Sequence, residues 1–133
     1  MNITTIASNP AWKDIQENIA MTEYHVQKAL ELFPKTDVIL FPELSLSGFV
    51  VDEDVEVVAQ AIDGPGVVSV LDMAKRYNVA IIAGIIEKVK GEKPANTVFV
   101  SSRKGELLAT YRKNHLFTES AEPSLYCRGG ELA

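Results

Sequence analysis

Residues 38–49, VILFPELSLSGF, join a short apolar run to a proline, a single carboxylate and a small polar loop. The apolar run Val38–Phe41 is typical of a strand that is buried on both faces, as in a sheet covered by helices. Pro42 has no N–H to donate to a neighbouring strand, so we expect strand pairing to stop there. Glu43 then follows the carboxyl end of a buried strand, where α/β folds bind their ligands.

Glu43 is therefore the first candidate functional residue. A carboxyl group at such a strand end is partly desolvated, and we expect its pKa to rise towards the range of a general base. In the alternative interpretation, Glu43 caps the loop or pairs with a surface cation. The local pattern leaves both interpretations open.

Strand and helix patterns alternate on both sides of this stretch. Their hydrophobic periodicities predict strands over 2–8, 38–41 and 79–86, helices over 14–33, 52–61 and 67–77, and a hairpin of two strands over 96–101 and 106–111. Pro34 ends the first helix, and a turn at residues 63–66 precedes the third. This alternation predicts an α/β fold in which helices cover a sheet, and the hairpin makes that sheet mixed.

Two details of packing follow from residue size and spacing. In the third helix, Val68, Leu71, Ala74 and Lys75 recur at helical spacing, which predicts an amphipathic helix. In the strand that follows, the small residues Ala83 and Gly84 allow another segment to pack closely.

The composition is typical of a soluble globular domain. The chain has 133 residues, of which 47% are hydrophobic and 23% charged, enough for one domain with its own core. Its net charge of −5 and its scattered basic residues argue against a nucleic-acid partner. The single cysteine, Cys127, fits a reducing compartment. The N-terminus does not resemble a signal peptide and no apolar run is long enough to cross a bilayer, so we expect a cytoplasmic protein without a membrane partner.

A second candidate lies in residues 111–117, YRKNHLF. This segment begins where the second strand of the hairpin ends, which puts Lys113 at a strand end, as Glu43 is. A lysine held close to a carboxylate stays protonated and can stabilise an oxyanion that forms at a carbonyl group. In the alternative interpretation, Arg112 and Lys113 are both solvated at a basic strand end.

His115 lies in the same segment, beside Leu116 and Phe117. A single histidine in such surroundings is more often structural, hydrogen-bonded to a backbone group or a carboxylate, than catalytic. The only other histidine, His25, falls inside a predicted helix, so a zinc site is not expected. Nothing in the sequence indicates another metal or an organic cofactor.

The third stretch, residues 118–131, TESAEPSLYCRGGE, carries the carboxylates Glu119 and Glu122 ahead of a pair of glycines. Either carboxylate could face the site. Residue type alone does not separate a functional side chain from a solvated loop charge.

Together, LFPELSLSGF, VAIIAG and YRKNHLF resemble the carbon–nitrogen hydrolase (nitrilase) superfamily, in that order and at similar spacing. The opening segment NPAWKDIQENI resembles the family's first strand and the start of its first helix. The resemblance extends over essentially the whole chain. It implies a four-layer αββα sandwich and a Glu-Lys-Cys catalytic set. In that chemistry a thiol attacks an amide, nitrile or carbamoyl carbon, ammonia or an amine leaves, and water releases the acid from a thioester.

The resemblance also implies roles for three residues. Glu43 in the PEL segment matches the general base of the family, and Lys113 in the RKNHLF segment matches the lysine that stabilises the oxyanion. A further family glutamate lies shortly before a glycine. Glu122, seven positions before Gly129, fits that place better than Glu119 does. Its implied role is to orient Lys113 and to help position a small-molecule amide substrate, and the family's chemistry uses no cofactor.

The nucleophile is where this chain departs from the family pattern. The family cysteine lies on a later strand, in a segment resembling ICYDxRFPE, and no such segment occurs before Ala133. Cys127, in the loop between Glu122 and Gly129, is interpreted as an ordinary loop thiol, because no strand end fixes its geometry. We therefore expect residues 1–133 to be an incomplete carbon–nitrogen hydrolase domain, the N-terminal half of the sandwich, truncated before the nucleophile segment.

Two hypotheses follow from this reading. In the first, the parent protein is a cysteine-dependent hydrolase of a small amide or N-carbamoyl compound, assembled as a homo-oligomer, and the 133-residue chain alone is inactive. In the second, the chain is a non-catalytic ligand-binding or assembly module derived from the same fold. In both cases the apolar strands over 38–41 and 79–86 lack a second covering layer, and such a face is expected to self-associate.

Overall fold

The computed structural model describes residues 1–130, which form a five-stranded sheet and four helices. The elements in chain order are β1 (Ile3–Thr5), α1 (Ile15–Leu32), β2 (Val38–Leu40), α2 (Val55–Val58), α3 (Pro65–Tyr77), β3 (Ala80–Glu87), β4 (Ala95–Ser101), β5 (Leu107–Arg112) and α4 (Glu122–Leu125). Glu131, the last residue of the third candidate stretch, lies outside the described residues. Among the described helices, none combines the length and the apolar character needed to cross a bilayer.

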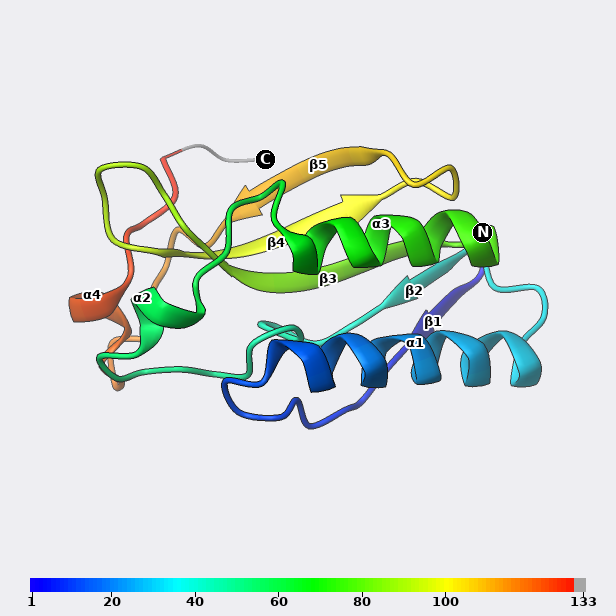
Figure 1. Cartoon of the computed structure of the whole chain (residues 1–133), viewed down its shortest axis with the longest axis horizontal. Helices are drawn as coiled ribbons and strands as arrows, with labels where there is room; N and C mark the ends of the chain where they lie inside the picture. The colour runs from blue at the N-terminus through cyan, green and yellow to red at the C-terminus, as the bar shows by residue number, and fades with distance from the viewer. Residues whose placement is uncertain (131–133) are drawn as a thin grey trace.

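The sheet is mixed, and its strands lie side by side in chain order, β1-β2-β3-β4-β5 (Figure 1). The first three strands are parallel, with Ile39 of β2 opposite Thr4 of β1 and Ile81 of β3. From β3 to β5 the strands are antiparallel, with Phe99 of β4 opposite Ala83 and Thr110. The α/β fold, the mixed sheet and the hairpin after β3 are therefore confirmed.

Local sequence explains where the long helices begin and end. The carboxylate of Asp14 caps α1 by accepting a hydrogen bond from the backbone N–H of Glu17 at 2.9 Å. Pro65 occupies the first turn of α3 after Gly64, and Asn78 ends that helix in the left-handed conformation. Because these signals are local, the predicted bounds of both helices agree with the structure to within a few residues.

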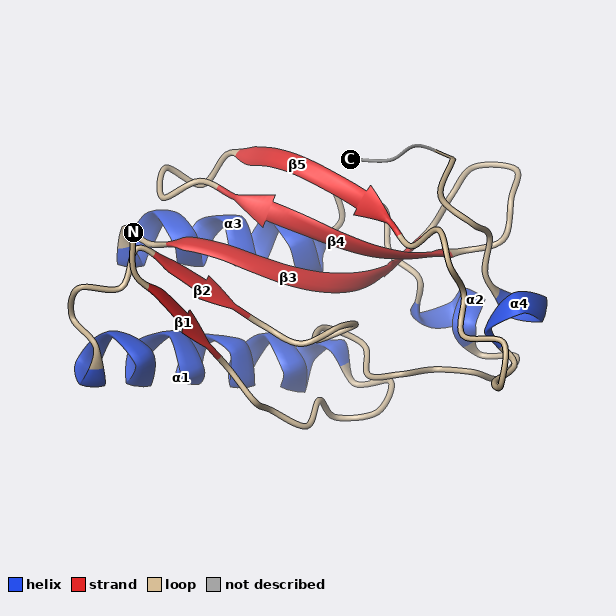
Figure 2. Cartoon of the chain, turned by 180° about the vertical axis from the view of Figure 1, so that it is seen from behind, coloured by secondary structure: helices blue, strands red, loops and turns tan. Residues whose placement is uncertain are grey.

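Helices α1 and α3 lie on one face of the sheet, so that the strands lie in front of them when the chain is seen from the other side (Figure 2). The core between the two layers combines alternate strand residues with the apolar stripes of the helices. Its central members include Val26, Ile39, Met73, Ile81 and Phe99.

One expectation about burial is wrong. Leu40 on β2 is 37% exposed, because α1 and α3 cover only the face of the sheet towards which Ile39 points. The apolar run is therefore buried on one face and not on both. Helix α3 is amphipathic as predicted: Ala74 is buried and Leu71 packs against the core, whereas Val68 is 52% exposed and lies off the stripe that faces the sheet. The buried residues of that stripe are Gly66, Val67, Val70, Met73 and Ala74.

The carboxyl ends of β2, β3 and β5 and the amino end of β4 lie at the same edge of the sheet (Figure 1). The loop after β2 and the short helices α2 and α4 gather at this edge. A second apolar cluster packs these segments together, and the hydroxyl of buried Tyr126 donates to the Val50 carbonyl at 2.6 Å. Segments far apart in the sequence therefore meet at one edge.

Candidate active site

Glu43 lies in a tight loop that packs directly onto β3. Leu44 has a positive φ of 50°, and a Cβ at Gly84 would lie only 2.5 Å from the Leu44 backbone nitrogen. The Gly84 N–H donates to the Ser45 hydroxyl at 3.1 Å, and the Gly84 carbonyl accepts from the Leu46 N–H at 3.1 Å. Only glycine permits so close an approach, so Gly84 fixes the loop that carries Glu43. The close packing expected at Gly84 is confirmed.

Lys113 directly follows the last residue of β5, at the strand end where it was predicted. Its backbone N–H donates to the Asn96 carbonyl at 2.8 Å, and its carbonyl accepts from the Gly129 N–H at 3.0 Å. A Cβ at Gly129 would overlap the carbonyl oxygen of Arg112. Only glycine therefore fits at position 129, where the segment after α4 contacts this strand end. The backbone of Lys113 is thus held from two sides.

Glu122 begins α4, and its side chain is 0% exposed. Its Oε2 atom accepts a hydrogen bond from the Phe117 N–H at 2.5 Å. Its Oε1 atom accepts from Lys113 Nζ and from Asn96 Nδ2, each at 3.1 Å. A fully buried carboxylate is tolerated only with such partners, so the position of Glu122 depends on all three donors.

Lys113 joins the two carboxylates of the site. Its Nζ atom lies 2.8 Å from Oε1 of Glu43 and 3.1 Å from Oε1 of Glu122. These ion pairs contradict the alternative in which Lys113 is simply solvated at a strand end. The structure therefore brings together the three residues to which the family resemblance assigned roles, and the roles themselves stay a prediction.

Burial and hydrogen bonding act in opposite directions on the pKa values of Glu43 and Lys113. Partial burial acts to raise the pKa of Glu43, but hydrogen bonds from Lys113 and Asn96 and the charge of Lys113 outweigh it, so that this pKa lies below its ordinary value. The expected rise in the pKa of Glu43 is therefore wrong, because the sequence does not show the two donors that face the carboxylate. Burial acts to lower the pKa of Lys113, but Glu43 and Glu122 outweigh it and raise this pKa. At neutral pH, Glu43 is ionised and Lys113 is protonated.

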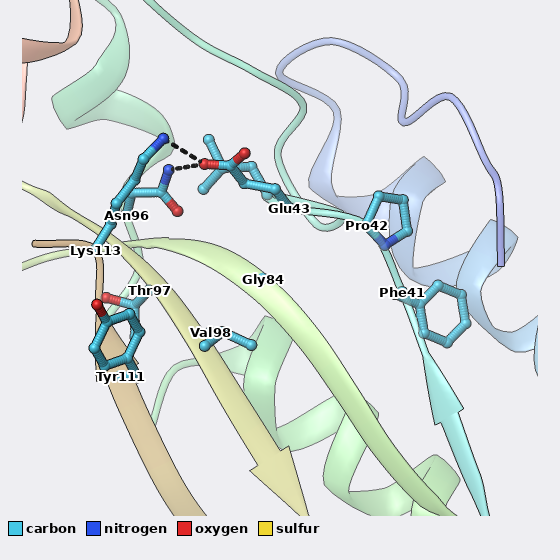
Figure 3. A pocket seen from close by; sticks show the side chains of 10 residues that line it. Phe41, Pro42, Glu43, Gly84, Asn96, Thr97, Val98, Tyr111 and Lys113 are labelled. Carbon is cyan, nitrogen blue, oxygen red and sulfur yellow. Dashed lines mark hydrogen bonds and ion pairs between the residues drawn. The ribbon is translucent and has the colours of Figure 1, made fainter. Parts of the chain in front are cut away.

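Asn96 is a site residue that the sequence did not indicate. It is 6% exposed near the start of β4, and its Nδ2 atom donates to Oε1 of Glu43 at 2.5 Å and to Oε1 of Glu122 at 3.1 Å. Figure 3 shows the side chains of Asn96 and Lys113 reaching the same oxygen of Glu43. Asparagine is depleted in strands, and its presence at the start of a predicted strand is the one signal that could have pointed to it.

These side chains border a cavity of about 360 Å³, a size suited to a small molecule. Its wall is formed by the loop after β2 together with β3, β4 and the end of β5 (Figure 3). The lining residues are Phe41, Pro42, Glu43, Leu44, Gly84, Asn96, Thr97, Val98, Tyr111 and Lys113. The cavity therefore combines an apolar wall with three convergent polar groups.

A second ion pair, between exposed Arg112 and buried Glu87, connects the strands beside the cavity. Glu87 on β3 is 5% exposed and accepts two hydrogen bonds from Arg112, at 2.6 and 2.8 Å, and one from the Thr97 hydroxyl at 2.8 Å. The hydrogen bonds from Arg112 are the main reason why the pKa of Glu87 lies below its ordinary value, with burial opposing them. Because Arg112 directly precedes Lys113, this pair also restrains the strand end that carries the lysine.

Three other candidates are not part of the cavity wall. Glu119 and His115 are exposed, and neither lines the cavity. Cys127 pairs with β4 at Ala95, and burial and the nearby Glu92 raise the pKa of its thiol, the opposite of what activates a nucleophile. Among the described residues, no group of three or more His, Cys, Asp or Glu side chains is arranged to hold a metal ion.

Comparison with known proteins identifies the family. The family model for carbon–nitrogen hydrolases matches residues 2–131. The chain belongs to the carbon–nitrogen hydrolase family. The resemblance carried by LFPELSLSGF, VAIIAG and YRKNHLF is therefore confirmed.

Similar carbon–nitrogen hydrolases include a probable nitrilase of Schizosaccharomyces pombe, which is 34% identical over 121 residues. That match covers 87% of this chain and 44% of the relative. The 2-oxoglutaramate amidase of Bacillus subtilis is 30% identical over 115 residues, a match that covers 86% of this chain and 42% of the amidase. The chain thus spans less than half the length of these curated relatives.

Solved structures of carbon–nitrogen hydrolases share the fold. An amidase from Nesterenkonia sp. superposes with a TM-score of 0.86 at 21% identity, over 98% of this chain and 49% of the amidase chain. A superfamily protein from Xanthomonas campestris superposes with a TM-score of 0.84 at 26% identity, over 97% of this chain and 46% of that chain. The α/β fold of this chain therefore corresponds to about half of a nitrilase-superfamily structure.

Proposed function

We propose that the protein containing this chain hydrolyses a non-peptide carbon–nitrogen bond in a small amide or N-carbamoyl compound and releases ammonia or an amine. One observation carries the proposal: Lys113 Nζ lies within 3.1 Å of both Glu43 Oε1 and Glu122 Oε1, at the wall of a cavity of about 360 Å³. Membership of the carbon–nitrogen hydrolase family and the relatives named as amidases support the class of bond.

Glu43 acts as the general base in this proposal. It is ionised at neutral pH, and its side chain is 54% exposed where it meets the cavity. The carboxylate accepts the proton of an attacking thiol, and the sulfur forms a bond to the carbonyl carbon. The electron pair of the C=O bond moves to oxygen, which creates an oxyanion beside the site.

Lys113 stabilises that oxyanion. An ammonium group has three N–H bonds, of which two point to Glu43 and Glu122, so one remains for the oxyanion. Glu122 is buried and supports Lys113 from behind. When the intermediate collapses, the C–N bond breaks, the proton held by Glu43 passes to the leaving nitrogen, and the acyl group stays on sulfur as a thioester. Water then adds to the thioester, which releases the acid and regenerates the thiol.

The proposal does not assign the attacking thiol to this chain. Cys127 is the only cysteine of the sequence, it does not line the cavity, and the pKa of its thiol is raised. In this proposal the nucleophile belongs to residues other than these 133, and the 133-residue chain alone releases no ammonia.

The test is ammonia or amine release from a panel of small amides and N-carbamoyl compounds by the full-length gene product. We expect turnover of at least one compound, and a loss of about 100-fold or more in kcat for Glu43→Gln and for Lys113→Met. Glu119→Gln, which changes an exposed carboxylate in the loop that precedes Glu122, is the matched control and retains the wild-type rate.

Three results would count against parts of the proposal. Turnover that persists in Glu43→Gln contradicts the role of the base. Ammonia release by the 133-residue chain alone contradicts the assignment of the nucleophile. A full-length product that binds amides in the cavity without turning any of them over supports the non-catalytic module instead.

A further inference from the structure

Asn96 touches every member of the charged site. Its side-chain Nδ2 atom donates to Oε1 of Glu43 at 2.5 Å and to Oε1 of Glu122 at 3.1 Å. Its backbone carbonyl accepts from the backbone N–H of Lys113 at 2.8 Å. One residue on β4 therefore connects the loop after β2, the end of β5 and the start of α4.

The direction of the Asn96 amide follows from the chemistry of its partners. Ionised carboxylates accept hydrogen bonds and cannot donate them, and an amide NH₂ group supplies two N–H bonds. The two N–H bonds match the two carboxylate oxygens, one each. The opposite orientation would turn the amide oxygen towards Glu43 and Glu122, with two repulsive contacts in place of two hydrogen bonds.

The side-chain amide of Asn96 is an uncharged donor among three ionisable side chains. Glu43 and Glu122 both lie within 3.1 Å of the single ammonium group of Lys113. Asn96 stabilises both of them and adds no positive charge that would draw either carboxylate away from Lys113.

The hydrogen bonds of Asn96 also select one oxygen of Glu43. Asn96 and Lys113 approach the same oxygen, Oε1, from different strands, and Figure 3 shows the other oxygen pointing away from both donors. A carboxylate with a single donor can rotate and exchange its two oxygens. Two donors that converge on one oxygen oppose that rotation.

We propose that Asn96 is a positioning residue that holds Glu43 by Oε1 and leaves Oε2 as the oxygen that accepts the proton. The catalytic part of this inference rests on the proposed function. The hydrogen bond between Asn96 and Glu43 does not depend on the proposed function, and it is measured separately from activity.

The coupling is tested by NMR on the full-length gene product, with ¹³C detection of the Glu43 carboxyl and detection of the Asn96 side-chain amide during a pH titration. We expect the Asn96 Nδ2 protons to shift in the same transition as the Glu43 carboxyl, because protonation at Oε2 turns Oε1 from a carboxylate oxygen into a neutral carbonyl oxygen, which is a weaker acceptor. This measurement needs no variant. Amide protons that do not respond in the Glu43 transition overturn the proposal.

Variants then separate donation from simple packing. Asn96→Leu keeps the approximate size and removes the donor, and we expect the Glu43 titration to move to higher pH by about one pH unit. Asn96→Asp keeps the shape and adds a third carboxylate, so the titration moves further in the same direction. Ser101→Ala is the matched control, because it removes a buried hydroxyl from the far end of the same strand, and it leaves the Glu43 titration unchanged.

The activity of the same variants distinguishes this inference from the proposed function. On the compound that the enzyme turns over, we expect kcat to fall about tenfold in Asn96→Leu, with KM changed less and the acid limb of the pH profile moved with the Glu43 titration. If no compound is turned over but the NMR coupling is present, the proposed function fails and the pairing of Asn96 with Glu43 stands. If turnover is present and Asn96→Leu alters neither the titration nor the pH profile, Asn96 is only structural and the inference fails.

Discussion

At the scale of single residues, the geometry of the site depends on a carboxylate that water does not reach. Glu122 is 0% exposed and its two oxygens accept hydrogen bonds from Phe117, Lys113 and Asn96. Each donor comes from a different part of the edge where the strands end. The buried carboxylate is therefore a common hydrogen-bond acceptor that connects α4 to β4 and to the end of β5.

Replacing Glu122 by Gln should destabilise the fold by about 1–3 kcal/mol, because an amide NH₂ group cannot accept the hydrogen bonds that one carboxylate oxygen accepts. The measurement is urea denaturation at pH 7. Glu119→Gln, an exposed residue on the same loop, is the control and should unfold at the wild-type midpoint. Equal midpoints for wild type and Glu122→Gln would mean that the buried carboxylate contributes nothing to stability.

At the scale of secondary-structure elements, the site depends on how closely the loop after β2 packs onto β3. Gly84 lies under the Leu44 backbone, where a Cβ would approach the Leu44 nitrogen to 2.5 Å. Glu43 is the preceding residue of that loop. A displacement of the loop at Gly84 therefore moves the candidate base directly.

Gly84→Ala should destabilise the protein by about 1–3 kcal/mol through overpacking, and should weaken the ion pair between Glu43 and Lys113. Thermal unfolding reports the first effect, and the ¹³C titration of Glu43 reports the second as a move to higher pH. Gly130→Ala is the control, because apart from its chain neighbours no atom of residues 1–130 lies within 4 Å of the added Cβ. If Gly84→Ala unfolds like Gly130→Ala, the close approach at β3 is not a constraint.

The pair between Glu87 and Arg112 joins β3 to β5 and should make stability depend on pH. The pKa of Glu87 is lowered in the folded chain, mainly by hydrogen bonds from Arg112, so folding favours the ionised form. Its stabilising effect is complete above the ordinary pKa of a glutamate and is lost as the pH falls through the lowered value. Between about pH 5 and pH 3, the unfolding free energy of the wild type should therefore fall as the pH is lowered.

The Glu87→Gln variant should be less stable than the wild type at pH 7. Its unfolding free energy should also fall less than that of the wild type when the pH is lowered from about 5 to about 3. Chemical denaturation at a series of pH values gives both quantities. Glu56→Gln, an exposed change on α2, should keep the wild-type slope. A Glu87→Gln variant with the full wild-type slope would show that other carboxyl groups account for the acid sensitivity.

The elements also show what could be predicted from the sequence and what could not. The bounds of α1 and α3 follow from Asp14 and Pro65, which are local signals, and the end of pairing after Phe41 follows from Pro42. The exposure of Leu40 and the position of Asn96 could not be predicted in this way. Burial depends on which face the helices cover, and the partners of Asn96 are 53 and 26 residues away in the sequence.

At the scale of the whole molecule, the two faces of the sheet differ. Helices α1 and α3 cover one face, and the strand registers place apolar residues in pairs on the other. We call this other face the open sheet face, and it is lined by Ile3, Leu40, Ile82, Val98 and Val100. Two of its members are well exposed, Ile3 on β1 at 53% and Leu40 on β2 at 37%. Contiguous apolar surface of this kind favours association.

We therefore expect the 133-residue chain, produced by itself, to self-associate through the open sheet face, because association removes apolar surface from water. Sedimentation velocity over a range of concentrations should show a rising average mass. Leu40→Lys should weaken this association by placing a charge on the open sheet face. Val57→Lys is the matched control, because Val57 is 81% exposed on α2 and away from the sheet, and it should associate like the wild type. A chain that stays monomeric at every concentration, or that both lysine variants weaken equally, would show that the open sheet face does not drive association.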